Sequence, residues 1–442
     1  MSNCMKSIFK LGLILLSIVV NAQQTSRAMS LQDCIDYALE NNITIQQNIL
    51  QEEIAENEIT RTSGNLLPKL SAGLSESANL YHNSRMRVNS YTTQFDFVQA
   101  NWTVFNGFRN INLQQNAILD QEIASKNVDI LKNDVALNIA NTYLQVLFNQ
   151  ALVEIAESQL LLSQKQLEIV TIQYNGGVVP EANIADANAA VAQDELSLVQ
   201  RKNNVESALL QLKALLQMPL DTPLEVQDVD AERYIAQLGL GMTSEIFRQA
   251  MEIRPEIELR TLQVEKAVNE QAIAEAGVLP TVSLGYGFGT GYTYFKENPN
   301  GNFGDQFTDN LGHAFTISIN VPIFDGYQNK TNIANAQINQ ESALLDLENE
   351  KYKLRQEIEA AYLDAVNAKQ TYEASLKNVE ARTIALDFMQ KRYDAGFSNI
   401  LDFEMAKNNW VAAKGNLAQA KYDFLFKVKV LEFYTSNRFE IN

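Results

Sequence analysis

Two long stretches of the chain, about 108–173 and 327–393, carry the pattern of helices. They are almost free of Pro and Gly and rich in Ala, Leu, Gln, Glu and Lys, which favour helix formation. In the first stretch apolar side chains recur every three or four residues, with Gln121 at one position of the series: Leu113, Ala117, Ala124, Val128, Leu131 and Val135. This is a heptad seam, along which one helix packs against another. At a rise of about 1.5 Å per residue, each stretch would form a rod of about 100 Å.

Further helices are predicted before and after these rods. A helix is expected early in each half of the chain, and a second long helix is expected after each rod: about 30–64 and 243–278, then about 181–217 and 399–436. Gly176, Gly177 and Gly396 interrupt the helical pattern between the two long helices of each half. The chain is expected to reverse there, so that the long helices become antiparallel neighbours.

The two halves of the chain share landmarks in the same order. Leu-Pro-Lys-Leu-Ser at 67–71 recurs 212 residues later as Leu-Pro-Thr-Val-Ser at 279–283. Two further motifs recur at an offset of 219 residues: Phe-Asn-Gly-Phe at 105–108 as Phe-Asp-Gly-Tyr at 324–327, and Tyr-Asn-Gly-Gly at 174–177 as Tyr-Asp-Ala-Gly at 393–396. A match that keeps one offset over about 70 residues indicates an internal duplication.

The duplication defines the predicted domains. The first repeat covers 23–217 and the second covers 243–442. Between them, 218–242 contains Pro219, Pro223 and Gly241 and is interpreted as a linker. Each repeat also contains a segment rich in Gly, Ser, Thr and aromatic residues, about 68–105 and 280–324, between its first helix and its rod.

These inserted segments have the period of two that is typical of β-strands. From 282 to 294 every even position is apolar, aromatic or Thr, while the odd positions are Ser, Gly or Thr. The return strand alternates in the same way through Phe315, Ile317, Ile319, Val321 and Ile323. In the first half the alternation changes phase after Phe97, which indicates a bulge. One large apolar face and one small face are expected of a strand that faces lipid on one side.

Four strands cannot close a membrane barrel, since the smallest barrels have eight. The predicted fold is therefore mainly α, with long antiparallel coiled-coil helices forming an α-barrel and four strands per chain. A homotrimer would close a 12-stranded transmembrane β-barrel. The polar connections 79–91 and 295–311 would be the outside loops, and the aromatic residues near the strand ends would suit the membrane interface. The alternative is a soluble β-hairpin inserted into a helical rod.

The first segment predicts export. Lys6 and Lys10 precede an apolar stretch, 11–20, and Val20-Asn21-Ala22 provides small residues for cleavage. We therefore interpret 1–22 as a signal peptide. The whole chain has a net charge of −18, and removal of the two lysines with the signal makes it −20, which argues against nucleic acid as a partner. The remaining cysteine, Cys34, lies among apolar residues and is interpreted as a buried small side chain.

No catalytic set, cofactor site or metal site is predicted. The glycine-rich segment 285–291 lacks the context of a nucleotide loop and fits the small face of a strand. His82 and His313 have no companions at metal-ligand spacing. The chain is therefore not expected to be an enzyme.

Acidic residues follow the helix reversals. Asp186 lies after the first, and Asp402 and Glu404 lie after the second. In a trimer, one carboxylate per chain would form a ring of three that attracts cations and disfavours closure through repulsion. The alternative for each residue is an ordinary acid near a helix start, stabilised by the helix dipole.

Together the duplicated order of elements, the Leu-Pro entries to the strands, the Phe-Asn/Asp-Gly exits and the two reversal motifs resemble the TolC family of outer-membrane efflux proteins. The resemblance covers nearly all of the chain after residue 22. It implies a trimeric channel in the outer membrane, with a helical tunnel in the periplasm that is closed at its inner end. It also implies that a periplasmic adaptor and an inner-membrane pump of the RND or ABC type open that end, and that the partners include outer-membrane lipid.

The resemblance also assigns residues to the gate. Tyr393 matches a gating tyrosine of the family, and Asp402 matches the first of two acidic positions that constrict the tunnel. Met405 stands where the second is expected, with Glu404 beside it, and Ser398 stands where an Arg is expected. The reversal turns would contact the adaptor through Gly177, Val178, Gly396 and Phe397.

Two functions are therefore open at this point. The first is a passive exit duct of a tripartite efflux or export system. The second is a membrane-anchored trimeric coiled-coil structural or surface protein.

Overall fold

The computed structural model describes residues 28–80, 89–229, 241–295 and 301–436. The predicted signal peptide 1–22 and His82 lie outside the described residues. The chain forms two compact units, and each unit draws on both halves of the sequence. The first contains the described residues up to 46, those of 130–254 and those from 353 onward, and the second contains those of 47–129 and 255–352. Across the described residues, none of the helices has a stretch long and apolar enough to cross a membrane.

The helices that open each half are broken in two, whereas the sequence predicted one helix in each place. The first half has α2 (Leu31–Asn41) and α3 (Ile43–Ser63), followed by a short 3-10 turn, η1 (Gly64–Leu66). The side chain of Asn42 accepts hydrogen bonds from the backbone N–H groups of Thr44 and Ile45, at 2.9 and 3.1 Å, and so starts a new helix.

The second half breaks at the equivalent place for a different reason. It has α7 (Thr243–Ile253), α8 (Pro255–Glu275) and the 3-10 turn η2 (Ala276–Val278). Arg254 is extended because the residue before a proline is pushed out of the helical region, and Pro255 then occupies the first position of α8.

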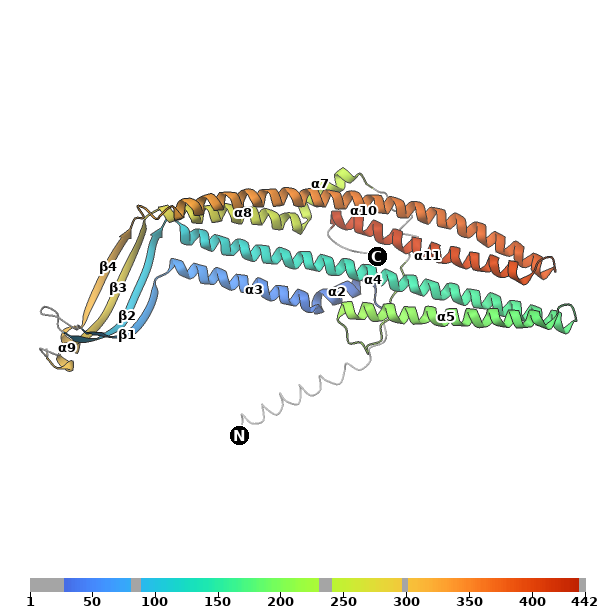
Figure 1. Ribbon diagram of the computed structural model, residues 1–442, viewed down its shortest axis with the longest axis horizontal. Helices are drawn as coiled ribbons and strands as arrows, with labels where there is room; N and C mark the ends of the chain where they lie inside the picture. The colour runs from blue at the N-terminus through green and yellow to red at the C-terminus, as the bar shows by residue number, and fades with distance from the viewer. Residues whose placement is uncertain (1–27, 81–88, 230–240, 296–300, 437–442) are drawn as a thin grey trace, which may run out of the picture. The chain divides into compact units, whose positions relative to one another are not determined.

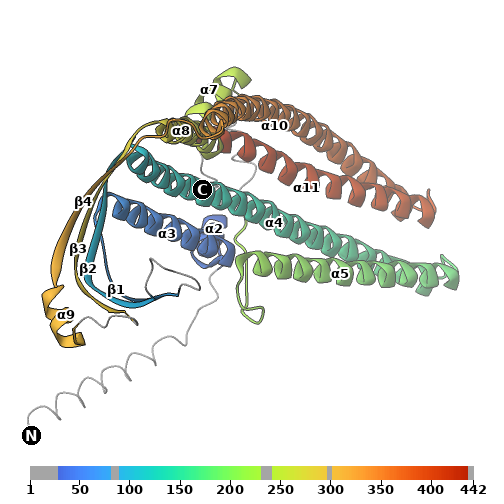
Figure 2. The same ribbon diagram turned by 60° about the vertical axis from the view of Figure 1, so that its left-hand side comes forward.

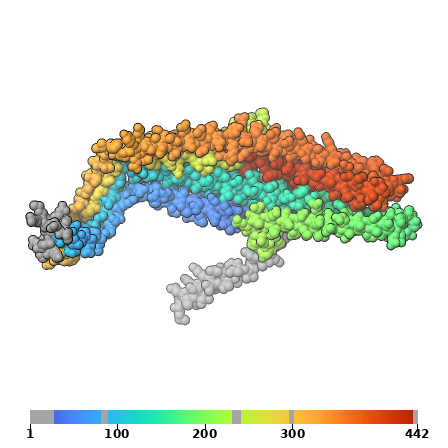
Figure 3. Space-filling view, viewed as in Figure 1, coloured from blue at the N-terminus to red at the C-terminus, as the bar shows by residue number. Residues whose placement is uncertain are grey.

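The predicted rods and their antiparallel partners are confirmed with shifts of one or two residues. They are α4 (Arg109–Asn175) with α5 (Glu181–Leu216), and α10 (Gln328–Asp394) with α11 (Ile400–Ser436). Figure 1 shows both helix reversals at the same end of the first unit. In the space-filling view α11 lies directly against α4 and α5 (Figure 3). Of the predicted seam in α4, Ala117 and Val128 are buried, and the other apolar positions are partly exposed.

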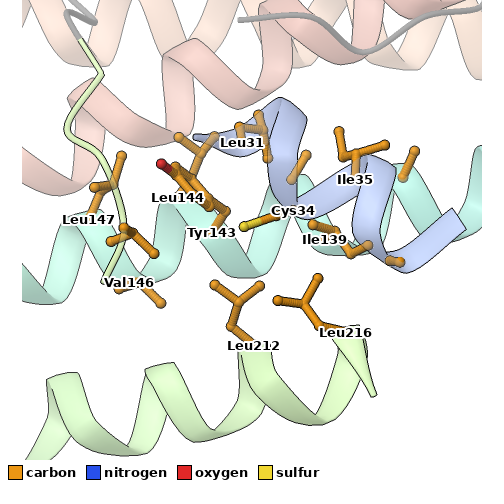
Figure 4. Close-up of a cluster of buried hydrophobic side chains, with 14 of the residues drawn as sticks. Leu31, Cys34, Ile35, Ile139, Tyr143, Leu144, Val146, Leu147, Leu212 and Leu216 are labelled. Atoms are coloured by element: carbon orange, nitrogen blue, oxygen red, sulfur yellow. The ribbon is translucent and has the colours of Figure 1, made fainter. Parts of the chain in front are cut away.

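A buried core of the first unit joins α2, α4, α5 and α11. Leu31, Cys34 and Ile35 of α2 face apolar residues of α4 and the C-terminal turns of α5 (Figure 4). At its centre the hydroxyl of the buried Tyr143 lies 3.0 Å from the carbonyl oxygen of Met29 and 2.6 Å from that of Gln227. Those carbonyls flank an isolated parallel β-bridge between Met29 and Val226. Tyr143 therefore fastens the start of the described chain and the segment after α5 to α4.

The predicted strands form one antiparallel sheet in the second unit. Its order is β1 (Lys69–Asn79), β2 (Ser90–Asn106), β3 (Thr281–Phe295) and β4 (Gly312–Asn320). The strands lie side by side in a curved sheet (Figure 2). The predicted apolar face is confirmed by the register, since Leu284 pairs with Ile317 and Tyr286 with Phe315. The phase change in β2 is confirmed as a register shift between Asp96 and Val98.

The bulge in β2 requires a glycine on the neighbouring strand. A side chain added at Gly289 would place its Cβ 2.3 Å from the carbonyl oxygen of Phe95. At Gly287, two residues earlier on the same face, the nearest atom to such a Cβ is the Cβ of Ala314, at 3.9 Å. At Gly289, close approach of the neighbouring backbone therefore excludes any side chain, which the alternation in the sequence alone did not reveal.

Two predictions about the second hairpin were wrong in detail. β4 ends at Asn320 instead of continuing to Ile323, because Pro322 has no N–H to donate to a strand ladder. The connection 295–311 is not only a polar loop, since it contains a helix, α9 (Phe303–Asp309). The side chain of Asn302 starts this helix by accepting the backbone N–H of Asp305 at 2.8 Å.

Candidate gate at the helix reversals

Both helix reversals use the same backbone motif. After α4 the N–H of Gly177 donates to the carbonyl of Tyr174 at 2.8 Å, and that of Val178 donates to Gln173 at 2.9 Å. After α10 the N–H of Gly396 donates to Tyr393 at 2.9 Å, and that of Phe397 donates to Arg392 at 2.8 Å. This pair of bonds defines a Schellman motif, which needs a left-handed residue just past the helix end.

Glycine meets that need in both turns. Gly177 and Gly396 have φ angles of 73° and 76°, a region that side chains disfavour. The residues that follow, Val178 and Phe397, are 74% and 77% exposed. In Schellman motifs the equivalent apolar residue frequently packs back on the helix. Here each tip presents an apolar side chain to its surroundings.

The helices resume by different means after the two turns. Pro180 precedes α5, and its missing N–H costs nothing at a helix start. Before α11, the side chain of Asn399 accepts the backbone N–H of Asp402 at 2.9 Å. The Asp402 carboxylate accepts a hydrogen bond from the Ser398 hydroxyl at 3.2 Å. Ser398 therefore orients the carboxylate, although it cannot neutralise it.

A cluster of buried side chains lies close to the reversals and joins the two helical hairpins, α4 with α5 and α10 with α11. It takes Val170 from α4, Ala187 from α5, Leu386 and Tyr393 from α10, and Phe403 and Trp410 from α11. The rings of Tyr393 and Phe403 are 5.7 Å apart between centroids, and the Trp410 indole N–H donates to Thr383 at 3.1 Å. The cluster fixes Tyr393 as a link between the hairpins.

The environment of Tyr393 keeps its phenol protonated. Burial raises the pKa of the Tyr393 hydroxyl, and the carboxylates of Asp394, Glu404 and Asp186 raise it further. A hydrogen bond with the Gln166 side chain acts in the opposite direction. Two of the predicted gate carboxylates, Glu404 and Asp186, therefore oppose ionisation of Tyr393.

A buried ionic network lies one helical turn further from the reversals, and the sequence analysis missed it. Lys407 is only 1% exposed, and its Nζ lies 3.0 Å from the Asp194 carboxylate and 2.7 Å from that of Glu404. It also donates to the Ser163 hydroxyl at 2.6 Å. Ser163 and Gln159 both donate to Asp194. The network thus joins α4 and α5 to α11.

One signal in the sequence could have revealed this network. Lys407 lies four residues after Phe403 and three before Trp410, so all three share one face of α11. A lysine on an otherwise apolar helix face requires a buried partner. The partner, Asp194, lies 213 residues away, and the sequence offers no way to choose it among the other carboxylates.

The predicted acidic residues differ in their surroundings. Asp186 is exposed on α5, Asp402 is half-buried beside Ser398, and Glu404 is paired with Lys407. Met405, at the position where the family resemblance led us to expect an acid, is exposed. Within the described residues, no three His, Cys, Asp or Glu side chains are grouped so that they could hold a metal ion.

The family model for outer membrane efflux proteins matches 34–217 and 246–435, which is most of the chain. The chain belongs to the outer membrane efflux protein family. The two matched ranges fall on the two halves that the duplicated motifs define. In both halves of this outer membrane efflux protein, the strands lie between the short first helices and the pair of long helices.

Individual relatives agree with the family assignment. Outer membrane protein TolC of Escherichia coli K12 is 23% identical over 405 residues, which cover 90% of this chain and 80% of TolC. Among solved structures, CusC has a TM-score of 0.78 with 19% identity, covering 95% of each chain. The open state of the Neisseria gonorrhoeae MtrE outer membrane channel has a TM-score of 0.70 with 22% identity, covering 92% of this chain and 88% of MtrE. The fold is thus that of outer-membrane channels.

Proposed function

We propose that three copies of this efflux protein form the exit duct of a tripartite efflux or export system. The observation that carries the proposal is the four-stranded sheet, in which β1 and β4 each pair on one side only. Open sheet edges carry unpaired backbone groups and are not tolerated in lipid. Three sheets joined edge to edge supply twelve strands and leave no open edge. The long helices would then continue the duct into the periplasm.

Conductance in planar bilayers tests this function. The purified trimer is expected to conduct weakly while its gate is closed, and more strongly when gate residues are substituted. A trimer that inserts but never conducts, even with Tyr393 and Asp402 substituted together, would refute the duct. That result would favour a membrane-anchored structural protein.

The proposed gate lies at the helix reversals, with Tyr393, Asp402, Glu404 and Asp186 as its residues. Its support is the buried position of Tyr393 between the hairpins and the carboxylates that surround it. Since Lys407 pairs with Glu404, we assign the uncompensated charge of the acidic ring to Asp402 and to the exposed Asp186.

Block of single channels by multivalent cations tests the ring. Asp402→Ala is expected to weaken the block, and Glu404→Gln, its matched control, is expected to weaken it less. Unchanged block in Asp402→Ala would remove this residue from the ring. Asp186→Ala measures the contribution of the first hairpin in the same recordings.

The exposed tips of the two turns are the proposed contact with a periplasmic adaptor, which would couple the duct to an inner-membrane pump of the RND or ABC type. The turn residues are Gly177 and Val178 in one hairpin and Gly396 and Phe397 in the other. Cysteines at Val178 and Phe397 are expected to crosslink to the adaptor in cells. A cysteine at Leu363, exposed on α10 away from the reversals, is the control. Equal crosslinking from all three positions would argue against the tips.

A further inference from the structure

The helix α9 lies at one end of the sheet (Figures 1 and 2). Phe303 of α9 lies against Phe95 and Tyr292, with ring centroids 6.3 and 5.3 Å apart. Phe307 lies 5.4 Å from the ring of Phe95. Tyr292 occupies an even position of β3. The helix α9 therefore lies on the face that also carries Leu284 and Tyr286, which pair with Ile317 and Phe315 of β4.

The same helix also completes an edge of the sheet. β4 pairs with β3 only as far as Gly289, so β3 continues for six residues without that neighbour. Side chains of the α9 segment take over the ladder bonds there. Gln306 accepts from the N–H of Thr293 at 3.0 Å and donates to its carbonyl at 3.2 Å, and Asn310 donates to the carbonyl of Gly291 at 2.6 Å.

Exposure changes sharply where α9 ends. Thr290, beneath the helix, is 1% exposed, and its hydroxyl donates to the carbonyl of Phe307 at 2.8 Å. On the part of the face that α9 does not cover, Phe315 and Ile317 are 81% and 73% exposed. The apolar surface left for lipid therefore stops at α9.

The chemistry of α9 suits the boundary between hydrocarbon and water. Its two phenylalanines pack on the sheet, Phe303 remains half-exposed, and the carboxylates of Asp305 and Asp309 are exposed. Aromatic side chains with one apolar and one wet side collect at this boundary. Backbone groups at an open edge must be satisfied before they approach lipid, and Gln306 and Asn310 do this for β3.

We propose that α9 is an interfacial helix that lies among the lipid headgroups at the outer surface of the membrane and sets the limit of the lipid-covered face. The partner is the headgroup layer of the bilayer. The proposal rests on the proposed function, because it requires the sheet to lie in the membrane.

Depth-dependent quenching in lipid vesicles tests the proposal. In a Cys34→Ala background, single cysteines at Phe303 and Ile317 are labelled with a small fluorophore. The vesicles contain a nitroxide either on the headgroup or in the middle of the acyl chain. The Phe303 label is expected to be quenched more by the headgroup nitroxide, and the Ile317 label more by the acyl-chain nitroxide. Gly304→Cys repeats the measurement on α9 with both phenylalanines kept.

The measurement distinguishes failure of the interfacial helix from failure of the proposed function. If the Ile317 label is quenched and neither α9 label is, the sheet is in the membrane and the interfacial helix is refuted. If the α9 labels respond more to the acyl-chain nitroxide, α9 lies in hydrocarbon, and the boundary is equally refuted. If no label is quenched, the sheet does not contact lipid, and the proposed function fails with the inference.

Discussion

Replacement of Lys407 by methionine tests the buried network near the helix reversals. Methionine keeps most of the volume of the side chain but leaves the Asp194 carboxylate without its cation. Asp194 is 4% exposed, so water cannot take the place of the ammonium group. Ser163 and Gln159 still donate to the carboxylate, but neither carries charge.

The magnitude follows from the geometry. Two unit charges 3.0 Å apart attract each other by about 5 kcal/mol at an effective dielectric constant of about 20. In the native pair, the cost of desolvating both groups offsets much of this attraction. When one partner is removed, the attraction is lost, but the desolvation cost of the remaining buried charge stays. We therefore expect Lys407→Met to lower the free energy of unfolding by about 3–5 kcal/mol. Glu404 is 23% exposed and can turn to solvent, so it adds little to the loss.

A double-mutant cycle separates the ion pair from general disruption. Asp194→Asn removes the charge and keeps acceptor and donor groups for Gln159 and Ser163. In the Lys407→Met background it is expected to restore at least about 2 kcal/mol, because no buried charge remains unpaired. The measurement is loss of helical circular dichroism with urea in detergent, at one fixed protein concentration because the proposed assembly is a trimer.

The control is an ion pair of similar distance on the surface. Lys391 and Asp387 of α10 are 2.6 Å apart and both more than half exposed, so Lys391→Met is expected to cost less than about 1 kcal/mol. If Lys407→Met costs no more than this control, or if the two substitutions in the network are additive, the pair does not hold the hairpins together and the reasoning is refuted.

Three further predictions concern the core and the sheet. Tyr143→Phe removes the hydroxyl that bonds the Gln227 carbonyl, while the Met29 carbonyl keeps the backbone N–H of Gln227 as its donor. The substitution is expected to lower the free energy of unfolding by about 1 kcal/mol in urea titrations, and an unchanged midpoint would contradict the fastening role. Burial raises the pKa of the Cys34 thiol to about 12, so the folded state keeps a proton that the unfolded chain loses above pH 9. The contribution of Cys34 to stability is then fully present below pH 9 and falls as the pH rises toward 12, by about 1.4 kcal/mol per unit. Cys34→Ala should make the measured slope shallower by this amount, most clearly between pH 9 and 10, below the range in which buried tyrosines such as Tyr422 contribute. Gly289→Ala forces a Cβ against the Phe95 carbonyl and is expected to reduce the yield of heat-resistant trimer on gels, whereas Gly287→Ala, with room for a methyl group, should not; equal yields would show that the bulge can relax.

Local patterns in the sequence predicted much of the fold. The rods and their partners follow from composition and apolar spacing, and their ends are marked by Gly177, Gly396 and Pro180. These signals act within a few residues of one another, so they can be read from the sequence without knowledge of the tertiary contacts. The alternation in β3 and β4 predicted their shared apolar face for the same reason.

The helix breaks show where local signals were present but not used. Pro255 is an explicit breaker, and the α8 helix begins there. Asn42 is a weaker signal, because an asparagine in a helix is common, and only its bonds to the backbone of Thr44 and Ile45 make it a cap. The α9 helix is too short to have a period of its own, and it is stabilised by the aromatic contacts that it makes with β2 and β3.

Some features of the candidate gate were also determined by the sequence, and others by the tertiary structure. The sequence determined the turns, whose glycines have a local physical cause, and the acidic residues that follow them, whereas the gate role of Tyr393 was an implication of the family resemblance and its buried position between the helical hairpins came from the tertiary structure. Only the tertiary structure decided which carboxylates have a cation beside them, since Lys407 pairs with Glu404 three residues away and with Asp194 in the other helical hairpin. A buried charge selects its partner by distance and burial, and these are properties of packed helices that no stretch of sequence contains.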